Sequence, residues 1–174
     1  MKRRLLFLTF YYPPDLSAGS FRASALINEL SRQAGKSWDI DVLTTMPNRY
    51  SSFSTEAVSF EKNGPVSVRR IPLSEHQSGM RDQALAFLGF AMQVGKVVLK
   101  KRYDAVFATT SRLATGVLGA FIANRSGIPF YLDVRDIFTE TIEDVLGNSP
   151  ARSLLPAIKA AERYAVGSAS RVNL

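Results

Sequence analysis

Residues 104–134, "DAVFATTSRLATGVLGAFIANRSGIPFYLDV", combine two kinds of pattern. The short runs "DAVFAT" (104–109) and "PFYLDV" (129–134) are largely apolar, which is typical of strands buried on both faces. Between them, "LATGVLGAFIANRSG" (113–127) is rich in small residues and predicts a helix that ends at Gly127. A strand, a helix and a second strand in this order predict a right-handed βαβ unit and a parallel sheet.

The same alternation extends over the rest of the chain. An apolar run, "RRLLFLTF" (3–10), predicts a first strand, and a helical pattern follows at 21–34. The further predicted strands are 39–45, 67–73 and 170–174, and the further predicted helices are 82–102, 137–146 and 151–169, the last with Pro156 near its start or splitting it. The polar, turn-rich stretch 46–65 is interpreted as a functional loop or a partly ordered excursion. The whole pattern predicts an α/β fold with a Rossmann-like, doubly wound parallel sheet, and no clear interdomain linker interrupts it.

The predicted helix at 21–34 has a plausible N-cap in Ser20, and Gly35 can close it. The spacing places four apolar residues on one helical face: Phe21, Ala25, Leu26 and Leu30.

Composition limits the classes of function. The 174 residues are 46% hydrophobic and 21% charged, which describes a globular chain, and 22 Lys+Arg against 15 Asp+Glu give a net charge of +7. That balance favours anionic partners such as nucleotide phosphates, nucleic acid or an acidic membrane surface. The basic residues are scattered and no aromatic stacking platform is evident, so the prediction is that the chain binds no nucleic acid.

The chain has no cysteine, which excludes a disulfide framework and a thiolate metal site and favours the cytoplasm. Its single histidine, His76, lies in a polar stretch, and the spacing of the acidic residues does not resemble a calcium loop. We therefore expect no metal and no cofactor. No window reaches the 18 or so apolar residues of a membrane span.

The connection after the first strand, "FYYPPDLSAGS" (10–20), is about ten residues long, whereas about two to six are usual. It contains neither G-x-G-x-x-G nor a P-loop motif. Gly19 and Ser20 enter the following helix, where backbone N–H groups could approach a phosphate, and Arg22 lies on its first turn. The alternative is a glycine that only eases a tight turn.

A second candidate site is "YLDVRDIFTET" (131–141), where Asp133, Arg135, Asp136 and Glu140 crowd the end of an apolar strand. Charged residues are rarely buried unless they are paired, so this cluster suggests a site. An internal ion pair with an aspartate helix cap is the alternative.

A third candidate is "TTMPNRY" (44–50), which places Asn48 and Arg49 just beyond the second strand. A ligand contact and a simple Pro-Asn turn are both compatible with it.

The predicted helix at 82–102 is amphipathic, and several cations lie toward its end: Lys96, Lys100, Lys101 and Arg102. Packing onto the sheet explains its apolar residues. Partial docking to an anionic membrane surface is the functional alternative.

Three segments in order resemble the N-terminal half of a retaining, nucleotide-sugar-dependent glycosyltransferase of family 4, with the two Rossmann-like domains of the GT-B architecture. They are "FYYPPDLSAGSFRASALINELSR" (10–32), "IDVLTTMPNRY" (40–50) and "YDAVFATTSRLATGVLGAFIANRSGIPFYLDVRD" (103–136). The chain is most similar to the WbuB-like branch that builds bacterial O-antigen and capsule. It departs from that branch in having Ala18-Gly19 for Gly-Gly, and Ile137, Phe138 and Thr139 for Leu-Trp-Pro.

The resemblance implies that residues 1–174 form the N-terminal, acceptor-side domain, and that the C-terminal donor-binding domain is absent from this chain, which alone should be inactive. It implies transfer of a sugar from a nucleotide diphosphate sugar to a saccharide acceptor, with a polyprenyl-diphosphate-linked acceptor favoured, in lipopolysaccharide or other surface polysaccharide biosynthesis. The expected location is the cytoplasm, with peripheral attachment to the inner face of the bacterial cytoplasmic membrane.

The resemblance also implies roles for the candidate residues. Gly19 and Ser20, with Arg22, would face the donor diphosphate. Arg135 and Asp136 would be the catalytic residues, and the acceptor side would be formed by Asn48, Arg49 and Glu140. Two alternatives stay open: a non-catalytic phosphosugar- or nucleotide-binding module, and half of a nucleotide-sugar epimerase of the same architecture.

Overall fold

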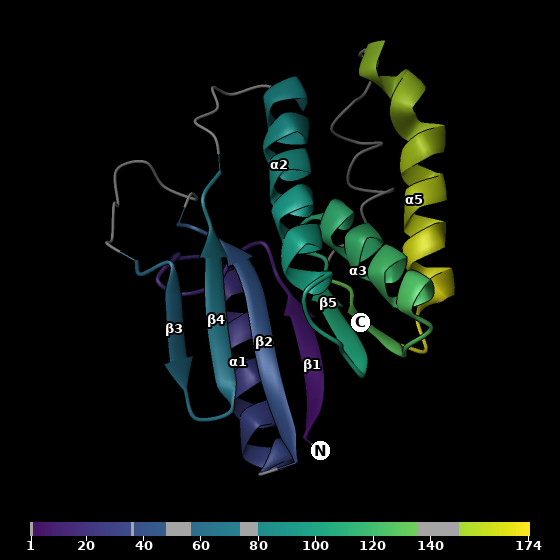
Figure 1. The fold of residues 1–174 in the computed structure, drawn as a ribbon. Helices are drawn as coiled ribbons and strands as arrows, with labels where there is room; N and C mark the ends of the chain where they lie inside the picture. The colour runs from purple at the N-terminus through teal and green to yellow at the C-terminus, as the bar shows by residue number, and fades with distance from the viewer. Residues whose placement is uncertain (1, 36, 48–56, 74–79, 136–149) are drawn as a thin grey trace. The chain divides into compact units, whose positions relative to one another are not determined.

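The computed structural model describes residues 2–35, 37–47, 57–73, 80–135 and 150–174 (Figure 1). The chain divides into two compact units, Met1–Asp104 and Ala105–Leu174. Both units are built from parallel strands and helices, so the predicted α/β, Rossmann-like class is confirmed.

The first unit contains strands β1 (Arg3–Leu8), β2 (Trp38–Thr45), β3 (Phe60–Asn63) and β4 (Val66–Ile71), with helices α1 (Ala18–Ala34) and α2 (Met80–Val98). The strand order is β3-β4-β2-β1. β1 pairs with β2, and β2 with β4, in parallel, while β3 pairs antiparallel with β4. Figure 1 shows α1 behind the strands and α2 on the viewer's side.

The second unit contains strands β5 (Ala105–Thr109), β6 (Phe130–Asp133) and β7 (Arg171–Asn173), with helices α3 (Leu113–Ser126) and α5 (Leu155–Ser168) and the 3₁₀ turn η1 (Pro150–Leu154). β5, β6 and β7 pair in parallel in that order. The predicted end of α3 is confirmed, because Gly127 takes the left-handed conformation at φ 64° and its N–H bonds the last turn. Pro156 lies in the first turn of α5, where its missing N–H costs nothing.

The stretch 46–65, expected as a functional loop or a partly ordered excursion, contains the strand β3. All four β3 residues are exposed, and the strand pairs antiparallel with β4. The hairpin turns at Gly64, which has φ 56°. The Asn63-Gly64 dipeptide is a hairpin signal that could have revealed this strand.

The predicted N-cap of α1 is also wrong. The helix begins at Ala18, and its N-cap is Ser17, whose Oγ accepts a hydrogen bond from the Ser20 amide at 3.1 Å. The face assignment needs correction too, since Phe21 is 59% exposed, whereas Ala23 and Ile27 are fully buried. The buried face of α1 is thus the one with Ala23 and Ile27, and the Phe21 side chain remains exposed to solvent.

Three residues of α2 pack inward: Ala86, Phe90 and Val94. Phe90 meets Phe10 edge-on, with ring centroids 5.7 Å apart, just beyond the end of β1. Four large apolar residues of the same helix and its end remain exposed: Leu85, Leu88, Met92 and Leu99. The predicted helix at 137–146 lies outside the described residues.

Candidate functional site

In a parallel sheet the ligand lies beyond the carboxyl ends of the strands, so the loop that leaves β1 is the first place to inspect. Two successive backbone carbonyls of this loop accept hydrogen bonds from threonine hydroxyls. Phe10 O accepts from Thr45 Oγ1 at 2.6 Å and from Thr44 Oγ1 at 3.3 Å, and Tyr11 O accepts from Thr9 Oγ1 at 2.9 Å. Hydrogen bonds from Thr44 and Thr45 therefore hold the start of this loop against the end of β2.

The loop then makes a tight turn. The Asp15 amide donates to Tyr12 O at 3.1 Å, the Pro13–Pro14 peptide is cis, and the Ser17 amide donates to Asp15 O at 3.2 Å. This arrangement is a β-turn of the cis-proline type. It delivers the chain directly to the cap of α1.

Pro13 is held by a side chain that the sequence did not single out. Arg70, near the end of β4, donates to Pro13 O from Nη2 at 2.6 Å and from Nε at 3.2 Å. Only 6% of this arginine is exposed. No local pattern marked it, because "VSVRRIPL" presents two adjacent arginines and only the fold shows which of them points inward.

The structure brings Gly19 and Ser20 together in the buried first turn of α1, while Arg22 lies on its exposed side. The Ser20 amide already donates to Ser17 Oγ, and the Ser20 hydroxyl is buried with no hydrogen-bond partner among the described residues. The amides of Ala18 and Gly19 also belong to the first turn of α1, where helix amides attract anions.

The second unit has a connected polar network where β5, β6 and β7 end. Thr110 links two of them, because its amide donates to Asp133 O at 2.9 Å and its Oγ1 accepts from the Arg135 amide at 3.0 Å. Asn173 Nδ2 donates to Asp133 Oδ1 at 2.7 Å, and the Val134 amide donates to Asn173 O at 2.8 Å. Asp133 is completely buried, so it serves this network and is not presented to a ligand.

Beyond the ends of β5 and β6, three buried polar atoms have no hydrogen-bond partner in the part of the chain that the structure describes: Ser111 Oγ, Thr115 Oγ1 and Arg135 Nη1. Ser111 precedes α3 and Thr115 lies in its first turn, whose amides carry partial positive charge. The first turn packs closely, since a Cβ on Gly116 would lie 3.1 Å from Thr110 Cγ2. Buried donors without partners are costly, so they mark this edge as a place where a ligand atom would be stabilised.

The remaining predicted site residues, Asp136, Glu140, Asn48 and Arg49, lie outside the described residues, as does His76. Their roles stay predictions. Among the residues that are described, no three His, Cys, Asp or Glu side chains are grouped so as to hold a metal ion. No helix in the described part of the chain is long and apolar enough to cross a membrane.

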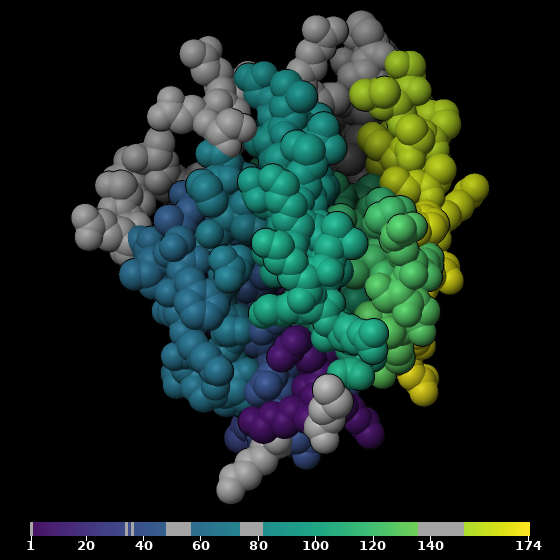
Figure 2. Space-filling model, viewed as in Figure 1, coloured from purple at the N-terminus to yellow at the C-terminus, as the bar shows by residue number. Residues whose placement is uncertain are grey.

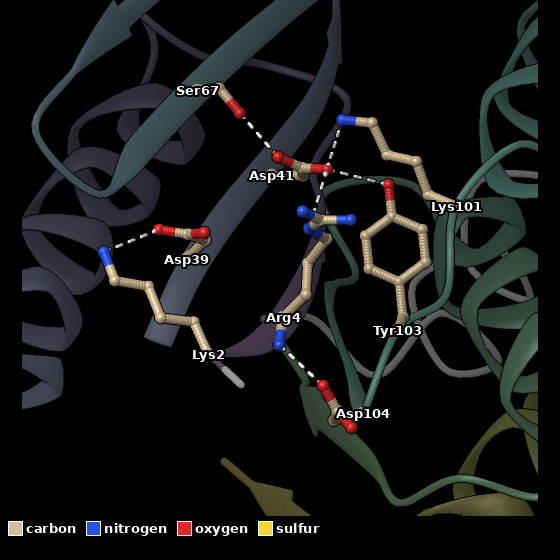
Figure 3. Close-up of polar contacts among 8 residues, drawn as sticks. All are labelled: Lys2, Arg4, Asp39, Asp41, Ser67, Lys101, Tyr103 and Asp104. Carbon is tan, nitrogen blue, oxygen red and sulfur yellow. Dashed lines mark hydrogen bonds and ion pairs between the residues drawn. The ribbon is translucent and has the colours of Figure 1, made fainter. Parts of the chain in front are cut away.

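The most extensive charged cluster of the first unit lies at the amino end of its strands (Figure 3). Asp41 is buried and accepts hydrogen bonds from Lys101 Nζ at 2.6 Å, Tyr103 Oη at 3.0 Å and Ser67 Oγ at 2.5 Å, and Arg4 Nε lies 4.0 Å away. Burial alone would raise the pKa of Asp41, but the hydrogen bonds from Lys101 and Ser67 outweigh it and hold the pKa below its ordinary value.

Burial, followed by the Asp41 charge, raises the pKa of the Tyr103 phenol. Sequence reasoning missed this cluster, although an aspartate inside the apolar run "DIDVLTT" was a usable signal. Because ligands bind at the opposite end of the strands, we assign the cluster to stability and not to the site.

Comparison with known proteins adds to this geometry. Residues 21–173 match a family described as "Glycosyl transferase 4-like domain". No curated protein matches the sequence.

Several solved structures are similar to the chain. Sucrose-phosphate synthase from Thermosynechococcus elongatus is 10% identical, with a TM-score of 0.61 over 98% of this chain and 42% of that one. The C-terminal domain of a hydrogenase from Pyrococcus furiosus is 16% identical, with a TM-score of 0.47 over 76% of this chain and 92% of that one. A ugt transferase from Siraitia grosvenorii, solved in complex with UDP, is 16% identical, with a TM-score of 0.43 over 88% and 34%.

At 10% identity, the similarity to sucrose-phosphate synthase shows a shared fold and nothing more. The chain spans about two fifths of the length of the synthase.

Proposed function

Because this chain belongs to the glycosyl transferase 4-like domain family, we propose that it is the N-terminal, acceptor-side domain of a retaining glycosyltransferase of GT-B architecture. The donor is a nucleotide diphosphate sugar, and the acceptor is a saccharide. A second, C-terminal domain supplies most of the donor contacts.

The observation that carries the proposal is a set of buried donors beyond the ends of β5 and β6 that have no hydrogen-bond partner among the described residues: Arg135 Nη1, Ser111 Oγ and Thr115 Oγ1. Nη1 of Arg135 is buried, and no described residue bonds it, while the Arg135 backbone N–H donates to Thr110 Oγ1 at 3.0 Å. A buried guanidinium N–H without a protein partner can donate a charge-assisted hydrogen bond to a substrate oxygen. Ser111 and Thr115 offer neutral donors of the same kind. Polar recognition of this type suits a sugar or its phosphate.

The roles in the reaction follow the carboxyl ends of the strands. The start of α1 at Gly19 and Ser20, with Arg22, stabilises charge on the leaving diphosphate. Arg135 and Asp136 orient the reacting sugar or acceptor, and Asn48, Arg49 and Glu140 contact the acceptor. The bond from the anomeric carbon to the diphosphate oxygen breaks, the acceptor oxygen bonds to that carbon, and the acceptor proton passes to the departing diphosphate.

The lipid-linked acceptor and the membrane location are supported by the exposed face of α2. Leu85, Leu88 and Met92 recur at three- and four-residue spacing and are 54–65% exposed. Figure 2 shows α2 (teal) uncovered along much of its length. Three exposed cations lie near its end: Lys96, Lys100 and Arg102. An apolar stripe beside cations fits an anionic lipid surface, where a polyprenyl-diphosphate-linked acceptor for surface polysaccharide synthesis would be found.

Transfer is tested with the complete open reading frame. The proposal expects the reading frame to continue beyond Leu174 into a second Rossmann-like domain with a Glu-x₇-Glu motif, and the purified protein to transfer label from a nucleotide sugar. Asp136→Ala is expected to abolish most transfer without changing the unfolding midpoint. A reading frame without a second domain would instead favour a non-catalytic binding module. Conversion of the nucleotide sugar without an acceptor would favour an epimerase.

A further inference from the structure

We propose that Arg70 is a positioning residue, which fixes the loop after β1 in the shape that sets the start of α1. The inference deepens the proposed function, because that loop leads to Gly19 and Ser20. No motif assigns Arg70 such a role; it stands on the contacts that its guanidinium makes within the first unit.

The guanidinium joins three segments of the chain. It donates to Pro13 O twice, to Val58 O from Nη1 at 3.1 Å, and to Glu61 Oε1 from Nη2 at 2.6 Å. Cζ of Arg70 lies 6.0 Å from the centroid of the Tyr12 ring. The side chain is 5% exposed, so these contacts are made largely away from water.

The Pro13 carbonyl shows why this arginine matters to the loop. The carbonyls of Phe10, Tyr11 and Tyr12 are satisfied by Thr44, Thr45, Thr9 and the Asp15 amide, all within the loop or at the strand ends. Pro13 O instead receives both of its described hydrogen bonds from a side chain 57 residues away. Loss of that donor would leave a carbonyl of a largely covered loop unsatisfied, which favours a different loop conformation.

Lysine cannot reproduce these contacts. The planar guanidinium directs Nε and Nη2 at one carbonyl while Nη1 reaches another, and a single ammonium has no such fork. Arg70→Lys therefore keeps the charge near Glu61 but loses the geometry at Pro13. This substitution separates positioning from simple charge neutralisation.

The strand that carries Arg70 does not itself depend on the side chain. β4 pairs with β2 on one side and with β3 on the other through backbone hydrogen bonds. The guanidinium instead bonds the turn Tyr12–Asp15, which leads to the Ser17 cap of α1. We therefore expect its loss to be felt in that loop first.

The matched control is the neighbouring residue Arg69, which is exposed and lies 5.3 Å from the Phe60 ring. Arg70→Lys and Arg69→Lys both replace a guanidinium by an ammonium, on opposite faces of the same strand. Hydrogen exchange is measured at the Asp15 and Ser17 amides, with the amides of β1 and β2 as internal references.

Arg70→Lys is expected to accelerate exchange at Asp15 and Ser17 about tenfold or more, with little change in β1 and β2 and none in Arg69→Lys. Exchange that stays at the unsubstituted rate would overturn the proposal. Uniform acceleration throughout the first unit would overturn it as well, since it would show a general structural role. Glu61→Gln, which keeps the guanidinium and its carbonyl contacts, is expected to give a smaller increase than Arg70→Lys.

Activity provides a second, separate readout in the complete protein. Arg70→Lys is expected to lower kcat/KM about tenfold or more at an unchanged unfolding midpoint, while Arg69→Lys has no effect. Equal turnover by the two variants would contradict the positioning role. If the unsubstituted protein transfers no sugar, the proposed function fails, and the exchange experiment still decides the role of Arg70.

Discussion

Lys101 Nζ lies 2.6 Å from Asp41 Oδ2 although sixty residues of chain separate them. The contact connects the segment that follows α2 with the interior of β2, and Tyr103 donates to the same carboxylate oxygen. A buried aspartate is tolerated here because its two oxygens together receive three hydrogen bonds, one of them from a cation. The pair therefore stabilises the first unit at the end of the strands away from the candidate site.

Asp41→Asn is expected to lower the free energy of unfolding by about 1–3 kcal/mol, because it removes a buried charge that Lys101 and Tyr103 both contact. Urea denaturation followed by circular dichroism measures the loss. The control is Asp39→Asn on the same strand, where Lys2 lies 3.5 Å away and the side chains of Lys2 and Asp39 are 53% and 32% exposed. That change is expected to cost less than about 0.5 kcal/mol; equal losses would contradict the assignment.

The same carboxyl group makes stability depend on acid pH. The folded-state pKa of Asp41 is lower than its ordinary value, so its contribution is complete above the ordinary value and is lost as the pH falls through the folded-state pKa. Stability is expected to decline below about pH 4, and more steeply than in Asp41→Asn. Unfolding midpoints measured from pH 6 to pH 2 test this expectation.

A second acidic group must be controlled in that experiment. Exposed Glu29 has its pKa lowered to about 2 by hydrogen bonds from Arg32 and Gln33. Glu29→Gln is therefore compared in parallel. If Asp41→Asn had the same pH dependence as the unsubstituted chain, the Asp41 interpretation would be refuted.

Gly119→Ala is expected to destabilise the second unit by about 1–3 kcal/mol through overpacking. A Cβ at this position would lie 2.9 Å from both Ala108 Cβ and Phe130 Cε2, so α3 could not keep its distance from β5 and β6. Gly89→Ala in α2 is the control, because nothing lies within 4 Å of its added Cβ. There the better helix propensity should raise stability by about 0.5–1 kcal/mol. Thermal unfolding of the two variants should shift in opposite directions.

Arg135→Met is expected to reduce transfer by the complete protein at least about a hundredfold, because in the proposed function it removes a charged donor to the substrate. The matched control is Arg125→Met at the exposed end of α3. Initial rates with a nucleotide sugar, together with unfolding midpoints, distinguish loss of chemistry from loss of fold. Normal turnover by Arg135→Met would remove this residue from the mechanism.

Vesicle binding tests the exposed face of α2. The chain is expected to sediment with vesicles that contain anionic lipids, to be released by salt, and to ignore neutral vesicles. Leu85→Ser, Leu88→Ser and Met92→Ser combined should abolish binding, whereas Phe121→Ser, an exposed apolar change on α3, should not. Lys101 is left unchanged because it is bonded to Asp41. Equal binding to neutral and anionic vesicles would count against the proposal.

Much of the fold was predictable from local pattern. The apolar runs that became β1, β2, β5 and β6 are strands buried on both faces, and such runs need no information from distant residues. β3 was missed because an exposed edge strand carries no apolar pattern. The packing face of α1 was misassigned because the periodicity fits more than one face, and contact with the sheet selected the one with Ala23 and Ile27.

The sequence by itself determined which segments follow the predicted strands and so carry the candidate site residues. Only the tertiary structure decided which distant charged residues contact these segments and the strands. Gly19 and Arg135 are candidates because each follows a predicted strand, and ligands bind beyond the carboxyl ends of the strands in a parallel sheet. Arg70 and Asp41 were not found, because their partners lie 57 and 60 residues away and no spacing rule connects them. Burial of a charged group is a property of the assembled fold, since only packing removes the water that would otherwise solvate it.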